Sequence, residues 1–586
     1  MVMKSFKFYS AALAGLLMLG ACSSSDDLNG GSAQNQDGKS YIAVNIQSVG
    51  AAGAASRADY PQGGNNYEDG TDAEGAIAKV RFFFFNNDGS PYLLKNSTVN
   101  YKDVQPDSVE NNSADQLHTI EGKTDAIIMI EGETKTAPAY MLAVVNPQTL
   151  KNLKDEAYRE SQLRDDFRDS QFLKAGKDFV MSNSVYYENG ARVCASPVSG
   201  HVAESTVAAQ KNPVEIYVER VVAKVTADVD NSKNAWEQIS TGADAGKYKT
   251  KVGEINVSET EKFPVYAVVE GWGLADEDLR ADLEKQITKS DVDKWTNAIL
   301  GINPWTTPDY HRCFWSSSVA ITPAGGDNPI GNHAYSDYTA TFGATTPKYT
   351  CPNTPTYTEF YNNGNYIDKN ENSLTKVLVA AKLVYYDKAN NAHFADICKY
   401  RGMEILGENS VKTQIAQDYK EYYTVDPSDA SKHIALSSSD LDYTRNNLEG
   451  EDPLKGYEVR PVLKSNVKVY QLDETSHQWI DKTTDLNKKL ADSPVQVRHE
   501  GMTYYYTPIR HLASNEKEWG YYGVVRNHSY RVTINSISGF GTPVYNPKEV
   551  IDPTIPKDTE TYLAARVNVL SWRVVSSSVN LDQTNK

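Results

Sequence analysis

Residues 76–85 have the sequence Ala-Ile-Ala-Lys-Val-Arg-Phe-Phe-Phe-Phe, and Asn86-Asn87-Asp88-Gly89 follows directly. A short apolar run that is rich in β-branched and aromatic residues is typical of a β-strand. An Asn-Asp-Gly sequence at its end is typical of a tight turn. The run therefore predicts a core strand of a β-sheet.

Similar runs recur along the chain and predict a mainly β protein with a few short helices. Strands are predicted at 126–130, 139–145, 179–181, 214–229, 377–386, 457–462, 467–472, 502–506 and 529–537. Apolar residues at helical spacing predict helices at 155–174 and 276–289. The 37 tyrosines, 37 glycines and 24 prolines also fit a β-rich protein with many turns.

The order of the strands predicts two consecutive β-sandwich domains. We place the boundary near 228–233, which gives an N-terminal domain at 58–228 and a C-terminal domain at 229–545. Long polar stretches, notably 303–370 and 426–454, interrupt the second half of the chain. We therefore expect the second domain to carry long insertions.

The N-terminus has the features of a secretory signal peptide that ends in a cysteine. Lys4 and Lys7 precede an apolar run at 8–19, and small residues lead into Cys22. The run is too short for a stable membrane-spanning helix. We predict a signal peptide at 1–21 and a lipid on Cys22. The alternative is an ordinary secretory peptide with an incidental cysteine.

A half-buried strand is predicted between a polar tether at 23–40 and a loose linker of small residues at 50–57. In this strand Ile42, Val44 and Ile46 alternate with other residues, so they share one face. The position is unusual because the strand precedes the first obvious core strand and has flexible sequence on both sides.

Arg57 ends the loose linker and is the only arginine before Arg81. Exposed linkers of small residues are preferred sites of proteolysis. Cleavage between Arg57 and Ala58 would detach the predicted strand from the rest of the chain. The alternative is that Arg57 is simply a solvated linker residue.

The chain ends with an apolar β-segment that follows an acidic, proline-containing linker at 544–561. Its apolar residues are Val567, Val569, Leu570, Trp572, Val574, Val575, Val579 and Leu581. An uncovered segment of this kind at a terminus promotes aggregation. We therefore expect residues 546–586 to act as a linker and donor strands for a neighbouring molecule. Folding back as the last strand of its own domain is the alternative.

Charge and cysteine content restrict the function further. The formal net charge of −17 would repel phosphate groups, so nucleic acid is not an expected partner. Besides Cys22, the chain has Cys194, Cys313, Cys351 and Cys398. Three disulfide pairings are open to these four cysteines, and isolated structural thiols are the simpler interpretation.

The sequence contains no recognisable catalytic or metal-binding motif, so we expect no enzyme, no metal and no cofactor. His499-Glu500 lacks the second histidine of a zinc-protease helix. His311 and Cys313 have no evident partner that would orient them. The acidic stretch 69–74 lacks the spacing and the distal glutamate of a calcium-binding loop.

Seven segments resemble known sequences when they are taken together and in order. They are the signal-peptide end at Cys22, the Ala-Ser-Arg-Ala junction at 55–58, and residues 76–85, 216–225, 349–354, 522–530 and 567–581. The combination resembles the fimbrillins of Bacteroidia, the subunits of the protease-assembled (type V) pilus, and in particular the larger fimbrillins of the short or minor fimbrium. The acidic spacer after Cys22 is similar to the surface-export tag of Bacteroidia lipoproteins.

The resemblance implies two tandem transthyretin-like Greek-key β-sandwich domains and a specific route of assembly. A lipoprotein precursor reaches the outer membrane, and an arginine-specific surface protease cuts after Arg57. The first strand then leaves, and the C-terminal segment of a neighbouring subunit fills the groove. The implied partners are other copies of the chain, the anchor, accessory and tip subunits, the protease and, before cleavage, the outer membrane.

We therefore expect a stalk subunit of a cell-surface pilus that supports adhesion and biofilm formation. An accessory or tip adhesin needs a groove but no donor segment, so the apolar C-terminus favours the stalk. An uncleaved anchor would keep its lipid, which the linker at Arg57 disfavours. A surface lipoprotein that binds or hydrolyses glycans would need helical repeats or a carboxylate-bearing cleft, and the sequence predicts neither.

Overall fold

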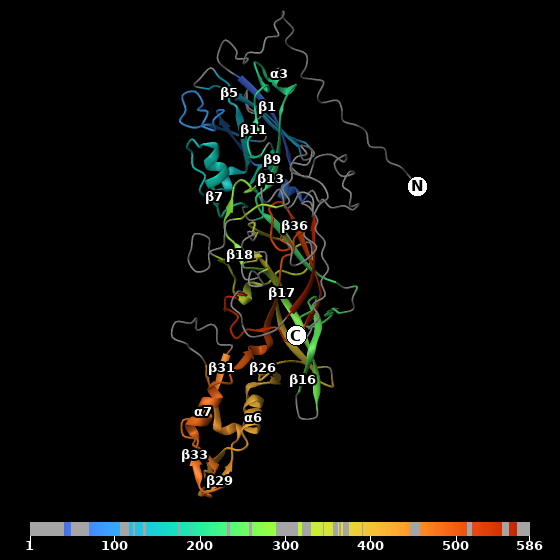
Figure 1. Cartoon of the computed structure of the whole chain (residues 1–586). Helices are drawn as coiled ribbons and strands as arrows, with labels where there is room; N and C mark the ends of the chain where they lie inside the picture. The colour runs from blue at the N-terminus through green and yellow to red at the C-terminus, as the bar shows by residue number, and fades with distance from the viewer. Residues whose placement is uncertain are drawn as a thin grey trace, which may run out of the picture.

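The computed structural model describes residues 40–48, 70–105, 116–120, 123–132, 136–173, 176–188, 190–230, 232, 235–256, 261–288, 315–318, 330–343, 345–354, 361–362, 365–366, 374–389, 391–445, 458–512, 519–553 and 562–570. These residues form an elongated molecule, with an N-terminal sheet at one end and an inserted unit at the other (Figure 1). The prediction of a mainly β protein is confirmed. The transthyretin-like Greek-key arrangement stays a prediction.

The N-terminal domain is built around one large sheet. Its strand order is β3 (Tyr101–Val104), β2 (Val80–Phe85), β6 (Tyr140–Val145), β8 (Met181–Asn183), β13 (Val214–Arg220), β1 (Ser40–Ser48), β5 (Lys123–Ile130) and β4 (Gln116–Ile120). Two short strands, β11 (Ser196–Pro197) and β12 (Val202–Ala203), pair with β6 and β1. The phenylalanines predicted to form a core strand lie in β2, and all four are fully buried.

The C-terminal domain is a sandwich of two sheets that share one hydrophobic core. The smaller sheet has the order β21 (Lys348–Thr350), β14 (Ala223–Val229), β36 (Ser529–Ser538) and β38 (Tyr562–Leu570). The larger sheet has the order β30 (Leu441–Arg445), β31 (Glu458–Leu463), β34 (Val495–Arg498), β26 (Ile397–Tyr400), β27 (Met403–Leu406), β16 (Tyr248–Asn256), β17 (Lys262–Ala275), β24 (Lys376–Tyr386), β35 (Met502–Pro508) and β37 (Thr542–Pro543). At its sides β15 (Glu237–Gln238) pairs with β16, and β25 (Ala392–Phe394) pairs with β24.

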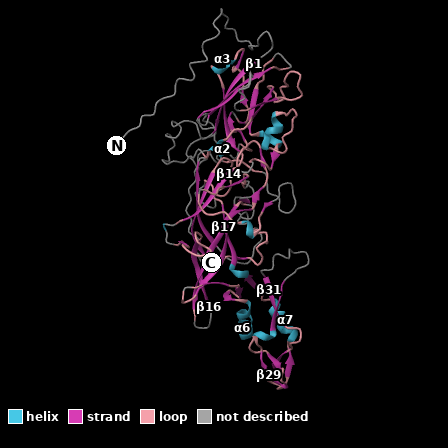
Figure 2. Cartoon of the chain, turned by 180° about the vertical axis from the view of Figure 1, so that it is seen from behind, coloured by secondary structure: helices cyan, strands magenta, loops and turns pink. Residues whose placement is uncertain are grey.

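A separate unit is inserted between β27 and β34, and we call it the insertion unit. It contains the four-stranded sheet β29 (Asp429–Ala435), β28 (Tyr423–Asp426), β32 (Val469–Leu472) and β33 (Trp479–Asp481), with helices α6 (Glu408–Asp418) and α7 (Thr483–Ala491). Buried residues of both helices form a hydrophobic cluster with β32 and β34. Figure 2 shows this unit at the end of the molecule opposite to β1. The polar stretch predicted at 426–454 therefore contains strands as far as Arg445.

The remaining elements are short. They are helices α2 (Asp72–Gly75) and α3 (Thr206–Gln210) and the strand pairs β7 (Arg168–Asp169) with β19 (Ala281–Asp282), β9 (Tyr186–Glu188) with β10 (Ala191–Val193), β18 (Glu277–Asp278) with β20 (Ile330–Gly331), and β22 (Tyr361–Asn362) with β23 (Asn365–Tyr366). In the part of the chain that the structure describes, no helix is long and apolar enough to cross a membrane.

The helix predicted at 155–174 is much shorter in the structure, where residues 160–166 are helical and Gln162–Asp166 form a π-helical turn. The helix predicted at 276–289 is wrong, because its described residues, 276–288, contain the short strands β18 and β19 and no helix. The two segments instead pair with each other, because Ala281 of β19 lies opposite Asp169 of β7. Their apolar residues do point inward, but the contact between segments far apart in the sequence overrides the helical spacing.

The domain boundary lies earlier in the chain than we predicted. The segment 214–229 is not one strand but two, since β13 belongs to the N-terminal sheet and β14 to the C-terminal sheet. The change of sheet occurs at Val221 and Val222, which are buried in a cluster with residues of both domains. An unbroken apolar run cannot reveal a crossing of this kind, because each side of it fits a buried strand equally well.

Candidate functional site

The strand predicted to be removable, β1, lies inside the N-terminal sheet and not at its edge. It pairs antiparallel with β5 along Ser40–Gln47 and parallel with β13 along Val44–Ser48. The short strand β12 extends the second side at Tyr41 and Ile42. The backbone of β1 is therefore hydrogen-bonded on both sides.

The side chains of β1 fill the core of the sheet. Ile42 and Val44 are completely buried, in one cluster with Ile128 of β5 and Val218 of β13. Ile46, the third residue of the predicted face, lies in register with Ile216 and Thr124. Because successive strand residues alternate between faces, Ile42 and Val44 share the face of β1 that points into the core.

Removal of β1 would divide the N-terminal sheet. In the strand order β1 is the link between β13 and β5, so its loss would leave both strands with an unpaired edge. Unpaired backbone groups and exposed apolar side chains together favour the binding of another strand. We refer to the space that β1 occupies, between β5 and β13, as the β1 groove.

The first part of the predicted donor segment pairs with its own domain. Strand β38 runs antiparallel to β36, with Val567 opposite Val532, Val569 opposite Tyr530, and Leu570 opposite Ser529. In the single chain, residues 562–570 therefore fold back as a strand of their own domain, which is the alternative to a donor strand. Among the described strands β38 is the last of its sheet and pairs on one side.

Several predicted site residues lie outside the described residues. They are the lipidation site Cys22, the processing site Arg57 and Ala58, and the later donor positions Trp572, Val574, Val575, Val579 and Leu581. Cys313 also lies outside. Cys194, Cys351 and Cys398 are buried free thiols, and burial raises the pKa of each of them.

A buried ion pair joins the two domains next to the change of sheet. Glu74 of α2 lies 2.8 Å from the Nζ atom of Lys224 in β14 and accepts a hydrogen bond of 2.6 Å from the hydroxyl of Tyr349 in β21. Burial raises the pKa of Glu74, but these partners outweigh burial and the net pKa lies below its usual value. Glu74 belongs to the acidic stretch 69–74, which lacks the spacing of a calcium-binding loop, and its carboxylate binds other side chains of the protein.

A second buried ionisable group, Glu284, lies beside the β7–β19 pair. Burial raises the pKa of Glu284 to about 8, despite the nearby positive charge of Arg526. Arg526 donates hydrogen bonds to the carbonyl of Leu283 at 2.8 Å and to the hydroxyl of Ser182 at 3.0 Å. Lys285 forms a buried ion pair with Glu219 of β13. Sequence analysis missed these contacts, because they join residues that are far apart in the chain.

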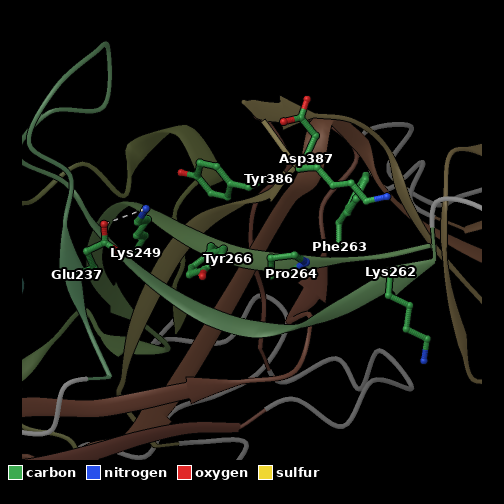
Figure 3. A pocket seen from close by; sticks show the side chains of 9 residues that line it. Glu237, Lys249, Lys262, Phe263, Pro264, Tyr266, Tyr386 and Asp387 are labelled. Carbon is green, nitrogen blue, oxygen red and sulfur yellow. Dashed lines mark ion pairs between the residues drawn. The ribbon is translucent and has the colours of Figure 1, made fainter. Parts of the chain in front are cut away.

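An open groove on the C-terminal sheet has a lining of charged and aromatic side chains (Figure 3). The Nζ atom of Lys249 lies 5.2 and 4.7 Å from the ring centroids of Tyr266 and Tyr386, and 3.1 Å from Glu237. Asp387 accepts hydrogen bonds from the backbone of the following turn. These groups already partner one another, so their arrangement is explained without a ligand.

Within the described ranges, no group of three His, Cys, Asp or Glu side chains is placed to hold a metal ion. His499, one of the histidines considered for catalysis, contacts the carboxylate of Asp396 at 2.9 Å. The expectation that the chain is neither an enzyme nor dependent on a cofactor stays a prediction.

The comparison with protein families identifies the C-terminal part of the chain. Residues 498–578, which include β35, β36 and β38, match the family described as major fimbrial subunit protein type IV, fimbrillin, C-terminal. These residues are similar to the C-terminal region of fimbrillins. The match confirms the resemblance to fimbrillins and supports a structural subunit of a cell-surface fimbrium.

Three solved structures are similar to the chain. A putative cell adhesion protein from Parabacteroides distasonis ATCC 8503 has 12% identity and a TM-score of 0.31, and covers 91% of this chain and 99% of its own. A fimbrial assembly protein from the same organism has 8% identity and a TM-score of 0.25, with 75% and 98% covered. The tip fimbrial protein Mfa3 from Porphyromonas gingivalis, with a C-terminal truncation, has 9% identity and a TM-score of 0.29, with 91% and 100% covered.

TM-scores at this level do not establish a common arrangement of domains. No curated protein sequence matches the chain significantly.

Proposed function

We propose that this fimbrillin is a stalk subunit that polymerises by strand exchange at the β1 groove. The precursor is exported as a lipoprotein through Cys22 and is cleaved between Arg57 and Ala58. Strand β1 leaves with the pro-segment and its lipid, and the C-terminal segment of a neighbouring subunit takes its place. The polymer is then held by protein contacts and not by lipid.

The observation that carries this proposal is the position of β1. Polar residues precede this strand in the sequence, and a linker of small residues that ends at Arg57 follows it. A strand in such a position is not expected to form part of a sheet core. Yet its Ile42 and Val44 are fully buried, and its backbone pairs on both sides. Cleavage at Arg57 would free this strand at one end and leave a groove that only another strand could fill.

The donor must restore the burial that β1 provides. Each buried Ile or Val side chain contributes roughly 1.5–3 kcal/mol, so an incoming strand needs apolar residues at alternate positions. Val567 and Val569 meet this requirement, and so do Leu570, Trp572 and Val574. Val567, Val569 and Leu570 would have to leave β36, which costs one row of backbone hydrogen bonds because β38 pairs on one side.

The test is to treat the purified full-length precursor with an arginine-specific protease and to follow ladders on mild, unheated gels. The wild-type protein should form ladders, and Arg57→Ala should remain monomeric. A fragment that ends at Arg57 should separate from the product in mass spectra as the ladders form.

Two truncations identify the donor. A chain that ends at Leu570 keeps β38, whereas a chain that ends at Thr561 lacks it. Loss of ladders in both variants assigns the donor to residues beyond 570. Loss only in the shorter chain requires β38 itself to move. Ladders that persist in the shorter chain would contradict strand exchange, and thermal unfolding of each uncleaved variant controls for misfolding.

The tip or accessory role remains a second candidate, with adhesion as its main activity. It predicts that the groove accepts a donor strand while the subunit offers none. A mixing experiment separates the roles, because a tip subunit would cap wild-type polymers without extending them.

A further inference from the structure

The insertion unit exposes an unusual amount of apolar surface on one hairpin. Eight large apolar side chains are exposed in the described part of the chain, and three of them belong to the β32–β33 hairpin. They are Leu472, Trp479 and Ile480, with exposed fractions of 46%, 36% and 41%. A concentration of apolar surface on one short element marks an interaction site more often than scattered residues do.

Four aromatic rings form a continuous cluster on the outer face of this sheet. The ring of Trp479 stacks on that of His433, with centroids 4.0 Å apart and planes at 10°. Tyr423 meets the edge of Trp479 at 5.2 Å, and Tyr470 meets His433 at the same distance. The other face carries Thr424 and Val469, which are buried against the insertion unit's own core. We call the outer face, with these four rings and Leu472, the aromatic face.

The hairpin that presents the aromatic face is held in place by its own turn. The Asp473 carboxylate accepts hydrogen bonds from the backbone N–H groups of Thr475 at 3.0 Å and Ser476 at 2.6 Å. The Asp473 and Gln478 backbone groups close the turn at 2.9 Å. A partner would therefore meet a preformed surface and pay little for ordering it.

The aromatic face and the β1 groove lie at opposite ends of the molecule. Both views show the insertion unit at one end, and β1 and α3 at the other (Figures 1 and 2). Helix α3 packs against β1, and its Val207 has the largest exposed fraction of the eight apolar side chains, 54%. Helix α3 therefore places one exposed apolar side chain next to the β1 groove, at the end of the molecule opposite to the aromatic face.

We propose that the aromatic face of one subunit packs on helix α3, at the exposed Val207, of the next copy of this chain. The inference rests on the proposed function, because strand exchange brings the C-terminal domain of the donor next to the N-terminal domain of the acceptor. A head-to-tail contact of this type repeats along a filament without closing. The aliphatic side chain of Leu472 offers no hydrogen-bonding group, which favours an apolar protein surface over a saccharide as the occupant. Ile480 alternates with Trp479 along β33 and therefore lies on the opposite face of the sheet.

A cysteine cross-link tests the contact directly. The full-length chain with both Val207→Cys and Ser476→Cys is cleaved by the protease, allowed to polymerise and oxidised, and each single variant serves as a control. The expected result is a disulfide-linked ladder in the double variant that survives boiling without reductant. A double variant that forms ordinary ladders but no boiling-resistant ladder would overturn the contact.

Substitutions test its contribution to the filament. Leu472→Ser with Trp479→Ser should still give ladders, but their half-life in warm detergent should fall at least tenfold. Phe394→Ser is the matched control, since Phe394 is 52% exposed on β25, and it should leave the half-life unchanged.

The outcomes separate the two proposals. An unchanged half-life in the Leu472/Trp479 variant would overturn the aromatic contact while strand exchange stands. Absence of ladders from the wild-type precursor would overturn both. Binding of immobilised neutral oligosaccharides that is lost in this variant, with filament half-life unchanged, would assign the aromatic face to a sugar instead.

Discussion

At the scale of single residues, buried charged pairs lie at the contact between the two domains. Glu74 with Lys224 and Glu219 with Lys285 are charged pairs removed from water, and each contains a residue of the N-terminal domain. A buried pair of this kind is costly to break, because the remaining charge is left without a partner. We therefore expect these pairs to determine the relative orientation of the two domains. Their net contribution to the free energy of unfolding should be small.

Glu284 gives this contact a measurable dependence on pH. Its pKa is raised from 4.5 to about 8, so the folded state holds a proton that the unfolded state releases. The stability associated with this proton is complete below pH 4.5 and is lost as the pH rises to about 8. Glu284→Gln removes the titration, so its stability relative to the wild type should increase by up to about 1.4 kcal/mol per pH unit in that window.

Urea unfolding of both proteins at pH 4.5, 6 and 8 measures the difference. Asp88→Asn, at an exposed turn residue, is the control and should show no comparable trend. A constant difference between Glu284→Gln and the wild type across this range would contradict a neutral buried carboxyl.

The sequence identified some of the important residues and missed others for a physical reason. Ile42 and Val44 were predicted from strand alternation alone, and both are buried in the core. Glu284 and Arg526 carry no local signal, because their significance comes from a contact between segments that are far apart in the chain. Local pattern therefore predicts which face of a strand is buried, but not which buried charges meet.

At the scale of elements, strands were predicted better than helices. The ten-residue run at 76–85 contains β2, and the segment 377–386 corresponds to β24. The longest strand, β17, was missed because Pro264, Gly271 and Gly273 interrupt its apolar pattern. Gly271 is required there, since a Cβ atom would lie 2.3 Å from the carbonyl oxygen of Tyr338. Gly271 therefore interrupts the apolar pattern of the strand in the sequence, and in the structure it allows the segment at Tyr338 to cross the strand closely.

Strand β1 should contribute strongly to the stability of the uncleaved precursor. Ile42→Ala removes a fully buried side chain from the core and should lower the free energy of unfolding by about 2–5 kcal/mol. Val207→Ala removes a similar side chain from the surface and should change it by less than about 0.5 kcal/mol. Urea unfolding of the Arg57→Ala background prevents cleavage during the measurement. Equal effects of the two substitutions would mean that β1 is not part of the folded core in solution.

At the scale of the whole molecule, the two domains are expected to unfold together, whereas the insertion unit is more independent. One hydrophobic cluster contains Phe83 and Leu142 of the N-terminal sheet together with Ala281 and Leu283 from beyond the change of sheet. A different cluster surrounds α6 and α7. It extends into β26, β31 and β34 of the larger sheet and includes no residue of the N-terminal domain. The sequence predicted separate domains, because it shows where apolar runs begin and end but not which of them share a core.

Leu283→Ala tests this coupling. The side chain is fully buried, so its loss should destabilise the protein by about 2–5 kcal/mol and increase hydrogen exchange in β6 of the N-terminal sheet. Ile415→Ala, an equally buried residue of α6, should increase exchange in the insertion unit and leave β6 unchanged. An effect of Leu283→Ala confined to the C-terminal domain would show that the domains unfold separately.

The central position of β1 has a mechanical consequence. Strand β1 is bonded to β5 on one side and to β13 on the other, and a donor strand that takes its place, as we propose, would have the same two neighbours. Tension along a filament would pull that strand parallel to its own axis, so both rows of hydrogen bonds would carry the load at the same time. A strand peeled from a sheet edge loses its bonds one after another, and far less force separates it. The strand exchange that we propose would therefore give a joint between subunits that resists shear, because it takes place in the middle of the sheet.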